Sequence, residues 1–200
     1  MFKEFIASQF RKPSGPFGIF TSNLMIKGNR KNYETMLVSL NPQPHDKLLE
    51  IGYGPGIGIS MIAEVCSNCK IDGIDFSQLM YKRAGKYHKR LIAEGRVSLQ
   101  FGDFLQAPLA ENHYDKIFCV NVIYFWNELR TPFQSVHSLL NHNGSFHIYM
   151  ADKKFLIEKK TPDSVFSKYS IEEVMEELKS VGFTQVDHTR DNGHFIKATK

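Results

Sequence analysis

The sequence predicts an α/β fold in which a mainly parallel sheet is covered by helices. Short apolar segments, several of which end in an acidic residue, alternate with segments of helical length and pattern. The first apolar segment runs into a turn with glycine at positions 52, 54, 56 and 58. At the end of the chain, two strand-like segments flank an Asp-Asn-Gly turn at 191–193, which is typical of a hairpin.

The first predicted strand, residues 47–51, carries Glu50 just before the glycine turn. Such a turn brings bare backbone against a ligand at the carboxyl end of a strand. The spacing differs from a dinucleotide fingerprint, because the third glycine would fall at Ile57 or Ile59. Pro55 lacks an amide donor for a phosphate, and the lysine of a P-loop is missing. The turn therefore predicts a site for a nucleotide-like cofactor of another kind.

The following elements repeat the pattern of a strand with an acid at its end. A helix is expected from Gly56 to about Val65, and a second strand ends at Asp75, 25 residues after Glu50. This is near the distance at which Rossmann-type sheets place a carboxylate on ribose hydroxyls. A helix then spans 77–93, and a third strand, 97–101, leads into Asp103.

The second half of the chain completes the alternation. A fourth strand, 114–120, is followed by a helix over 127–140 and by a turn at Asn143 and Gly144 before the fifth strand. Ser170 opens a last helix to residue 180 with the sequence of a capping box. The closing hairpin then pairs segments 182–188 and 195–199.

Two motifs resemble those of the class I S-adenosylmethionine (SAM) methyltransferases, in particular the small single-domain bacterial type. They are E-x-G-x-G-x-G from Glu50 and D-F-S-x-x-M-x-x-x-A from Asp75. The resemblance covers residues 45–200, which form the predicted methyltransferase domain. It implies a Rossmann-like sheet of seven mostly parallel strands, with an antiparallel last strand and helices on both faces.

The resemblance also implies SAM as cofactor and S-adenosylhomocysteine as product. The glycine loop would accommodate the methionine part, Asp75 the ribose, Phe76 one side of the adenine and Asp103 the adenine amino group. The end of the fourth strand would face the reacting methyl. The residues expected to bind the cofactor are Glu50, Gly52, Gly54, Gly56, Asp75, Phe76, Asp103, Phe104 and Asn121.

The acceptor is less well defined by the sequence. Methyltransferases of nucleic-acid amino groups carry Asp/Asn-Pro-Pro-Tyr/Phe after the fourth strand, whereas this chain has Asn-Val-Ile-Tyr-Phe-Trp from Asn121. Tyr124, Phe125 and Trp126 form either an aromatic wall for an apolar or cationic acceptor or part of the core. A base is optional in this chemistry; the candidates are His147, which is expected near the crevice, and Tyr124, with His137, His142 and His194 as further histidines.

Residues 1–44 form an N-terminal helical and turn-rich arm. Its centre, 11–18, is rich in proline and glycine and lies between two apolar stretches. The arm is expected to cap the active site, with Phe17, Phe20, Met25 and Tyr33 lining the cap. The residues expected to contact the acceptor are Tyr124, Trp126, Phe17 and Tyr33. The alternative is a helical brace packed on the sheet.

Composition fits one domain that lacks an appended recognition module. The chain has 200 residues, of which 42% are hydrophobic, and 25 basic against 21 acidic residues. This mild excess does not indicate DNA binding. The N-terminus fits neither a signal peptide nor a transmembrane helix, so a cytoplasmic location is expected. No metal site is expected: Cys66 and Cys69 have no second pair and are predicted to be reduced, and Cys119 is predicted to lie in the core.

Three functions remain open. The first is methyl transfer to a small molecule. The second is methylation of protein or RNA, with a basic footprint on the arm. The third is SAM binding without catalysis, or a nicotinamide-dependent oxidoreductase. The footprint of the second would consist of Arg11, Lys12, Lys27, Arg30 and Lys31.

Overall fold

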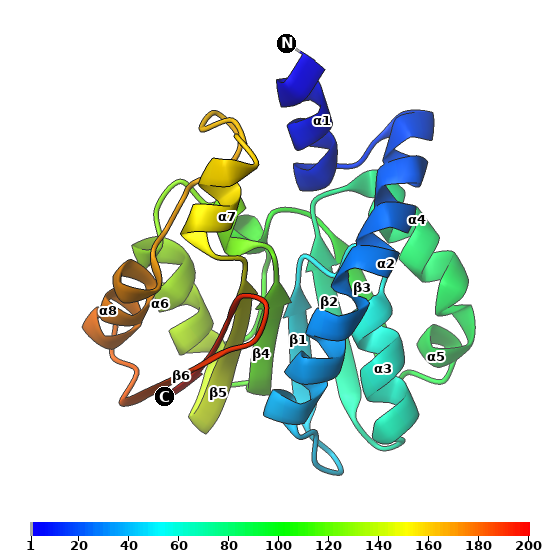
Figure 1. Cartoon of the computed structure of the whole chain (residues 1–200). Helices are drawn as coiled ribbons and strands as arrows, with labels where there is room; N and C mark the ends of the chain where they lie inside the picture. Colours follow the sequence, from blue (N-terminus) through cyan, green and yellow to red (C-terminus); the bar gives the residue numbers. More distant parts are fainter. Residues whose placement is uncertain (1) are drawn as a thin grey trace.

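The computed structural model describes residues 2–200 and contains one seven-stranded sheet (Figure 1). The strand order is β3-β2-β1-β4-β5-β7-β6, and β7 alone runs against its neighbours β5 and β6. The predicted fold, with seven strands and an antiparallel last strand, is thereby confirmed. The strands are β1 (Lys47–Ile51), β2 (Lys70–Asp75), β3 (Val97–Phe101), β4 (Tyr114–Val120), β5 (Leu140–Met150), β6 (Gln185–Arg190) and β7 (His194–Thr199).

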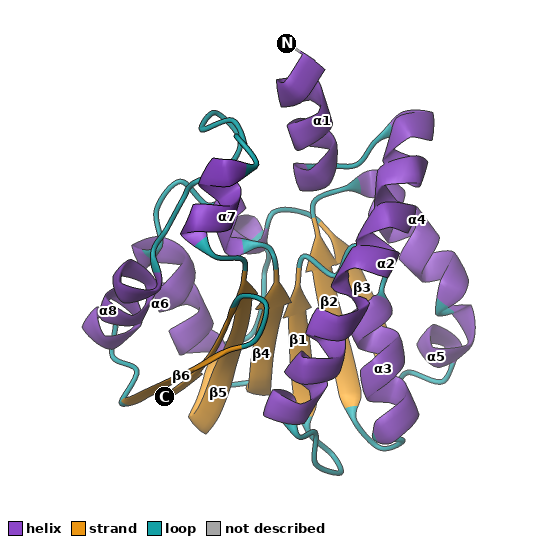
Figure 2. Ribbon diagram, in the orientation of Figure 1, coloured by secondary structure: helices purple, strands orange, loops and turns teal. Residues whose placement is uncertain are grey.

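Helices cover both faces of the sheet (Figure 2). They are α1 (Phe2–Arg11), α2 (Gly15–Leu40), α3 (Ile57–Val65), α4 (Gln78–Tyr87), α5 (Lys89–Ala93), α6 (Arg130–Leu139), α7 (Lys153–Glu158) and α8 (Ile171–Ser180), with short 3-10 turns η1 (Phe104–Gln106) and η2 (Ile123–Phe125). None of the helices within residues 2–200 combines the length and the apolar character needed to cross a membrane.

The two faces follow from the alternation of side chains along the central strands. In β1, Leu48 packs into a core with α2, α3 and α4, whereas its neighbour Leu49 packs into a second core with α6 and α8. In β4, Ile117 and Phe118 divide in the same way. Because successive side chains of a strand point to opposite faces, nearly continuous apolar strands bury both faces of a sheet.

The predicted helix boundaries are correct for α3 and differ for the next helix. The helix expected over 77–93 is interrupted at His88, which ends α4 and begins α5. The His88 ring is buried, and its Nε2 lies 3.0 Å from the carbonyl oxygen of Gly56. This tertiary contact fixes the break, which helix propensity alone does not indicate.

The arm is more helical than its composition suggests. The predicted turn at 11–18 is limited to residues 12–14, because α2 begins at Gly15 with Pro16 in its first turn, a position where proline is tolerated. The Ser77 hydroxyl donates a hydrogen bond of 2.7 Å to the Pro13 carbonyl and thereby ties this connection to the start of α4. Farther along α2, Met36 and Leu40 are buried in the core. The C-terminal half of α2 is therefore packed as part of the domain.

The C-terminal elements agree with the predictions, apart from two differences. The Ser170 capping box is present at α8, and the hairpin β6–β7 forms. However, α6 begins at Arg130 rather than at residue 127, and α7 was not predicted. Helix α7 has only six residues, too short for a clear helical period.

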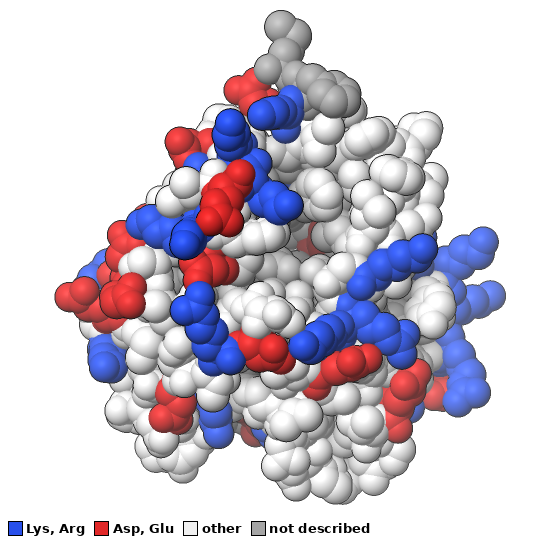
Figure 3. Space-filling model, viewed as in Figure 1, with Lys and Arg blue, Asp and Glu red and all other residues white. Residues whose placement is uncertain are grey.

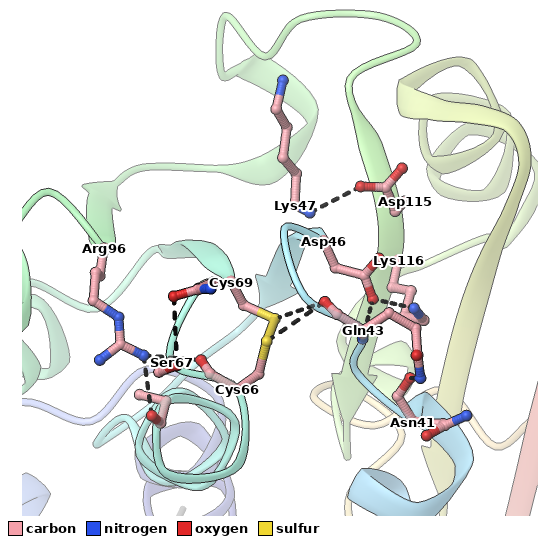
Figure 4. Close-up of a disulfide and its surroundings, with 12 residues drawn as sticks. Asn41, Gln43, Asp46, Lys47, Cys66, Ser67, Cys69, Arg96, Asp115 and Lys116 are labelled. Atoms are coloured by element: carbon pink, nitrogen blue, oxygen red, sulfur yellow. Dashed lines mark hydrogen bonds and ion pairs between the residues drawn. A yellow bond between two sulfur atoms is a disulfide. The ribbon is translucent and has the colours of Figure 1, made fainter.

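Cys66 and Cys69 form a disulfide, so the prediction of two reduced cysteines is wrong (Figure 4). Cys66 caps α3 and Cys69 precedes β2, which places their Cα atoms 5.5 Å apart, within bridging distance. Both sulfurs face the Gln43 carbonyl, and Arg96 Nη2 donates to the Ala63 and Cys66 carbonyls at 3.0 and 2.9 Å. Cys119 is buried, as predicted.

Candidate functional site

The glycine turn after β1 lies beside the end of β2. Gly52, Gly54 and Gly56 have φ angles of 71°, 53° and 89°, a region that glycine enters without steric cost. A side chain on Gly54 would enter open space, since its nearest neighbour within 4 Å would be Met25 Cε, at 3.9 Å. The loop thus presents bare backbone to the space above the sheet.

Asp75 joins this loop to the next helix. Its Oδ2 accepts a hydrogen bond of 2.8 Å from the Gly54 N–H, and its Oδ1 accepts one of 2.8 Å from the Ser77 N–H. Burial raises the pKa of Asp75 to about 6, and the two backbone donors oppose that rise. Because the Gly54 N–H already donates to the Asp75 carboxylate, it is not free to donate to a pyrophosphate. The negative carboxylate instead favours a ligand that carries hydroxyl donors or positive charge.

A cavity of about 920 Å³ opens above the carboxyl ends of the strands (Figure 3). Its walls in this view are mostly uncharged, and basic and acidic side chains lie on its outer rim. One part, here named the loop half, is lined by predicted cofactor residues. These are Gly52, Gly54, Asp75, Phe76, Asp103, Phe104 and Asn121.

The other part, the mouth half, is lined by side chains from the arm, from η2 and from the segment after β5. Phe125 and Phe166 pack with ring centroids 5.1 Å apart, and Trp126 packs on Phe104 at 6.3 Å. Met25 lines the cavity as expected of the arm. The residues that define the mouth half are Phe10, Arg11, Leu24, Met25, Tyr124, Phe125, Trp126, Phe155, Leu156, Lys159 and Phe166.

A polar network crosses the boundary between the two halves. Asn121, at the end of β4, has a φ of 60°, and its Nδ2 donates to Asn29 Oδ1 at 3.0 Å. The Tyr124 hydroxyl donates to Asn121 Oδ1 at 3.0 Å and accepts a hydrogen bond from the Ala151 N–H. Burial raises the pKa of Tyr124 far above its usual value. Tyr124 therefore stays protonated and orients Asn121, which removes it as a candidate base.

Glu50 and Gly56 lie outside the cavity lining, contrary to prediction. The Tyr33 hydroxyl donates to Glu50 Oε1 at 2.8 Å, and both side chains are buried beneath the loop. Burial, opposed by the Tyr33 hydrogen bond and assisted by nearby Asp75, raises the pKa of Glu50 to about 8, so that Glu50 is largely protonated at neutral pH. A Cβ at Gly58, in the first turn of α3, would approach Glu50 Oε2 to 2.7 Å, so α3 packs directly against this buried carboxyl.

Three further predicted site residues lie elsewhere. Tyr33 supports Glu50 and does not line the acceptor site. Phe17 packs between Phe5 and Phe20 at 5.4 and 6.1 Å, outside the cavity lining. His147 on β5 is buried between Ser39 and Ser145, each 2.9 Å from a ring nitrogen, and burial lowers its pKa to about 3. Its side chain therefore projects from a face of the sheet. The carboxyl end of β5, at Met150, lies three residues farther along.

The remaining histidine candidates are also absent from the cavity lining. His137 packs on Phe183, and His194 contacts His188 at 2.9 Å. His142 lies in the exposed turn region of β5. Within residues 2–200, no group of three histidine, cysteine or acidic side chains is placed to hold a metal ion.

Several residues that line the cavity were not predicted. Asn29 and Asn32 follow Met25 on α2 at helical spacing, a signal that periodicity could have supplied. Phe155 and Leu156 lie in the run Lys-Lys-Phe-Leu-Ile-Glu-Lys-Lys, in which three apolar residues stand between pairs of lysines. Asn192, in the hairpin turn, gives no sequence signal, because only the sheet order brings it to the cavity.

Comparison with known proteins agrees with this geometry. A family profile described as a methyltransferase domain matches residues 48–144, which include the glycine turn, Asp75 and Asn121. The chain is 24% identical over 151 residues to sterol 24-C-methyltransferase of Kluyveromyces lactis, a match that covers 70% of this chain and 40% of that enzyme. It is 27% identical over 142 residues to the Bacillus subtilis methyltransferase YdaC, with coverage of 71% and 74%.

A solved structure shares the fold over the full chain. Phosphoethanolamine N-methyltransferase 2 of Haemonchus contortus, in complex with SAM, superposes with a TM-score of 0.77 at 17% identity. The match covers 100% of this chain and 60% of that enzyme, so this chain spans less than two thirds of that enzyme, as it does of the sterol enzyme. The family match over residues 48–144 supports a class I SAM-dependent methyltransferase, and the seven-stranded sheet has the fold of the matched methyltransferase.

Proposed function

We propose that this protein transfers a methyl group from SAM to a small-molecule acceptor with an apolar body. The observation that carries the proposal is the continuous cavity of about 920 Å³, which joins the loop half to an aromatic mouth half. This volume lies near the upper end of the range of about 300–1,000 Å³ that is common for small-molecule sites. Asn121 marks the boundary at which cofactor and acceptor would meet.

The residues of the loop half fit SAM. The space beside Gly54 accepts a ligand chain against bare backbone, and the two acids at the strand ends, Asp75 and Asp103, suit hydroxyl and amino donors. A phosphate-bearing cofactor would favour lysine or arginine beside it, and neither lines the loop half. The basic residues that line the cavity, Arg11 and Lys159, belong to the mouth half. Phe76 and Phe104 offer apolar surfaces for a flat base.

When bound, SAM supplies an electrophilic methyl on its sulfonium. The chain then has to align an acceptor nucleophile with the methyl and exclude water. Tyr124 and Asn29 fix the side chain of Asn121 at the boundary, and Phe125 and Trp126 present an apolar wall there. The cavity lining of residues 2–200 contains no histidine, so we propose an acceptor that is nucleophilic without a histidine base.

A small-molecule acceptor also agrees with the names of two matched proteins, which are methyltransferases of a sterol and of phosphoethanolamine, and the sterol has an apolar body. The basic footprint expected for a protein or RNA substrate is weakened by ion pairing. Arg30 pairs with Glu34 at 3.2 Å, and Lys31 pairs with Asp191 at 3.4 Å. Both the paired charges of the arm and the aromatic wall of the mouth half therefore favour a small-molecule acceptor over protein or RNA.

The test is transfer of label from methyl-labelled SAM into fractions of a cell extract. We expect label in the metabolite or lipid fraction. Label in protein or RNA would contradict the proposed acceptor class. Binding of SAM without transfer into any fraction would instead support a non-catalytic SAM-binding protein.

A further inference from the structure

Large apolar side chains are exposed together around the mouth half. They belong to α1, to the first turns of α2 and to α7, which stand at the end of the sheet toward which the parallel strands point (Figure 2). An exposed apolar patch of this kind marks an interaction surface more often than scattered single residues do. The exposed side chains are Phe5, Ile19, Phe20, Leu24, Phe155 and Ile157.

On α2, the exposed apolar surface continues the cavity wall. Phe20 precedes Leu24 by four residues, so the two side chains share one face of the helix. Leu24 lines the cavity and is 45% exposed, and Phe20 is 57% exposed. Phe17 packs between Phe20 and Phe5, which joins this stripe to α1. The apolar stripe therefore leads from outer surface to cavity without interruption.

Helix α7 provides the opposite rim and combines apolar and basic side chains. Phe155 lines the cavity and is 49% exposed, and Ile157 is 55% exposed. The segment 153–160 contains four lysines and one glutamate. Lys153 pairs with Glu173 at 3.4 Å, whereas Lys154 and Lys160 are exposed and Lys159 Nζ lies 5.4 Å from the centre of the Phe155 ring.

Across the cavity, the arm adds the same combination. Lys12 is exposed next to the apolar residues of α1, and its Nζ lies 5.6 Å from the centre of the Phe76 ring. Arg11 lines the mouth half. Aromatic and aliphatic side chains that project between lysines match a lipid bilayer, in which the apolar groups enter the acyl boundary and the cations meet anionic headgroups.

We propose that the rim of the mouth half docks on an anionic lipid bilayer, and that the acceptor enters the cavity from that bilayer. The lipid rim is defined here as Phe5, Phe20, Ile157, Lys12, Lys154 and Lys160, none of which lines the cavity. The positive charge of the rim complements anionic headgroups, and its apolar stripe is continuous with the acceptor wall. Delivery of the acceptor rests on the proposed function, whereas docking does not.

The test is flotation of the full chain with vesicles of phosphatidylcholine alone or with about 30% phosphatidylglycerol. We expect binding to the anionic vesicles at low salt, weaker binding at about 0.5 M salt and little binding to phosphatidylcholine alone. Lys154→Gln with Lys160→Gln should lower partitioning by about tenfold or more, since each basic residue contributes near an anionic surface. Phe20→Ser with Ile157→Ser should lower it by about tenfold.

The matched control is Val38→Ser with Val65→Ser. These valines are 80% and 61% exposed but lie at the ends of α2 and α3, at the opposite end of the sheet. The control should partition like the wild type. Far-ultraviolet circular dichroism and calorimetry with S-adenosylhomocysteine should be unchanged in every variant, because none of the substituted residues lines the cavity.

Failure of the wild type to bind anionic vesicles at low salt would overturn the docking proposal. An equal loss in the valine control would do the same. If the Phe20 and Ile157 substitutions instead change the oligomeric state in the absence of lipid, the patch is an interface between protein chains and the proposal is wrong. Each of these results can be obtained while S-adenosylhomocysteine still binds, so they are distinct from failure of the proposed function.

Discussion

The loop half and the mouth half of the cavity are built in different ways. In the loop half, short segments at the ends of adjacent parallel strands converge: Gly52 N donates to the Ile74 carbonyl at 2.7 Å, and Gly54 N donates to Asp75. In the mouth half, side chains from α1, α2, η2 and α7 meet, and these elements are far apart in the sequence. The backbone shapes the first half and side chains shape the second.

This difference predicts different responses to substitution. Residues of the loop half have little choice of type, because a positive φ and a buried hydrogen-bonded carboxylate each require a particular residue. Residues of the mouth half need only supply apolar surface, which several side chains can do. Changes in the loop half should therefore act on cofactor affinity, and changes in the mouth half on the acceptor.

The largest effect should come from Gly54→Val. The branched side chain would fill the space beside the loop at a φ of 53°, and we expect affinity for S-adenosylhomocysteine to fall about 100-fold or more. The control is Gly95→Val, which has a similar φ of 65° and open surroundings away from the cavity. It should share the strain and keep the affinity in a calorimetric titration. Equal losses in both variants would show that backbone strain, not occupancy of the cavity, is responsible.

Asp75→Ala should weaken cofactor binding by about 1.5–3 kcal/mol, the value of hydrogen bonds to a charged group. Asp72→Ala is the matched control on the same strand, because Asp72 accepts from the Tyr114 hydroxyl at 2.9 Å and does not line the cavity. Calorimetry should show a loss for the first variant alone. A neutral result at Asp75 would mean that the ribose lies elsewhere.

Glu50→Gln tests whether the buried carboxyl beneath the loop is protonated. The folded protein holds a proton on Glu50 up to a pKa of about 8, and the unfolded chain releases it near 4.3, so the free energy of unfolding should fall as pH rises through this window. The slope from one such group is about 1.4 kcal/mol per pH unit. Asp75, with a pKa of about 6, adds a loss of the same sign at lower pH.

Urea unfolding of Glu50→Gln should therefore show a flatter dependence than the wild type between about pH 6 and pH 8. Tyr33→Phe, which removes the donor to Glu50, should keep the wild-type direction of the pH dependence. Identical slopes for wild type and Glu50→Gln would contradict the assignment of a protonated Glu50.

The smallest effect should come from Phe10→Ala in the mouth half. Loss of one partly buried aromatic contact should raise the KM for an apolar acceptor by about tenfold, equivalent to about 1–2 kcal/mol. Affinity for S-adenosylhomocysteine should stay within about twofold, because Phe10 belongs to the half that the glycine loop does not form. Steady-state kinetics and calorimetry on the same preparation separate the two. A loss of cofactor affinity with an unchanged KM would reverse the assignment of the two halves.

The same contrast explains which parts could be predicted from the sequence. The sheet, the glycine turn and Asp75 follow local rules: apolar alternation, positive φ and an acid at a strand end. The place of Asn192 depends on the antiparallel pairing of β7, which no local pattern specifies. Tyr33 and Phe17 were misplaced because the arm forms a long helix, whose faces decide what each side chain contacts.

Glu50 and His147 show a second limit. Both lie on strands, and their side chains point into the packed faces of the sheet rather than toward its end. Position along a strand was predicted correctly, but which buried partner each side chain would meet depends on tertiary packing. The disulfide between Cys66 and Cys69 was missed for the same reason, since spacing alone allows both the reduced and the bridged state.

Calorimetric titration of the wild-type chain with S-adenosylhomocysteine, and in parallel with NADH, tests most directly whether the loop half is a SAM site. The structure predicts that one molecule of S-adenosylhomocysteine binds per chain and that NADH does not bind, because the Asp75 carboxylate occupies the Gly54 amide that a pyrophosphate would need. Binding of NADH without binding of S-adenosylhomocysteine would contradict this assignment.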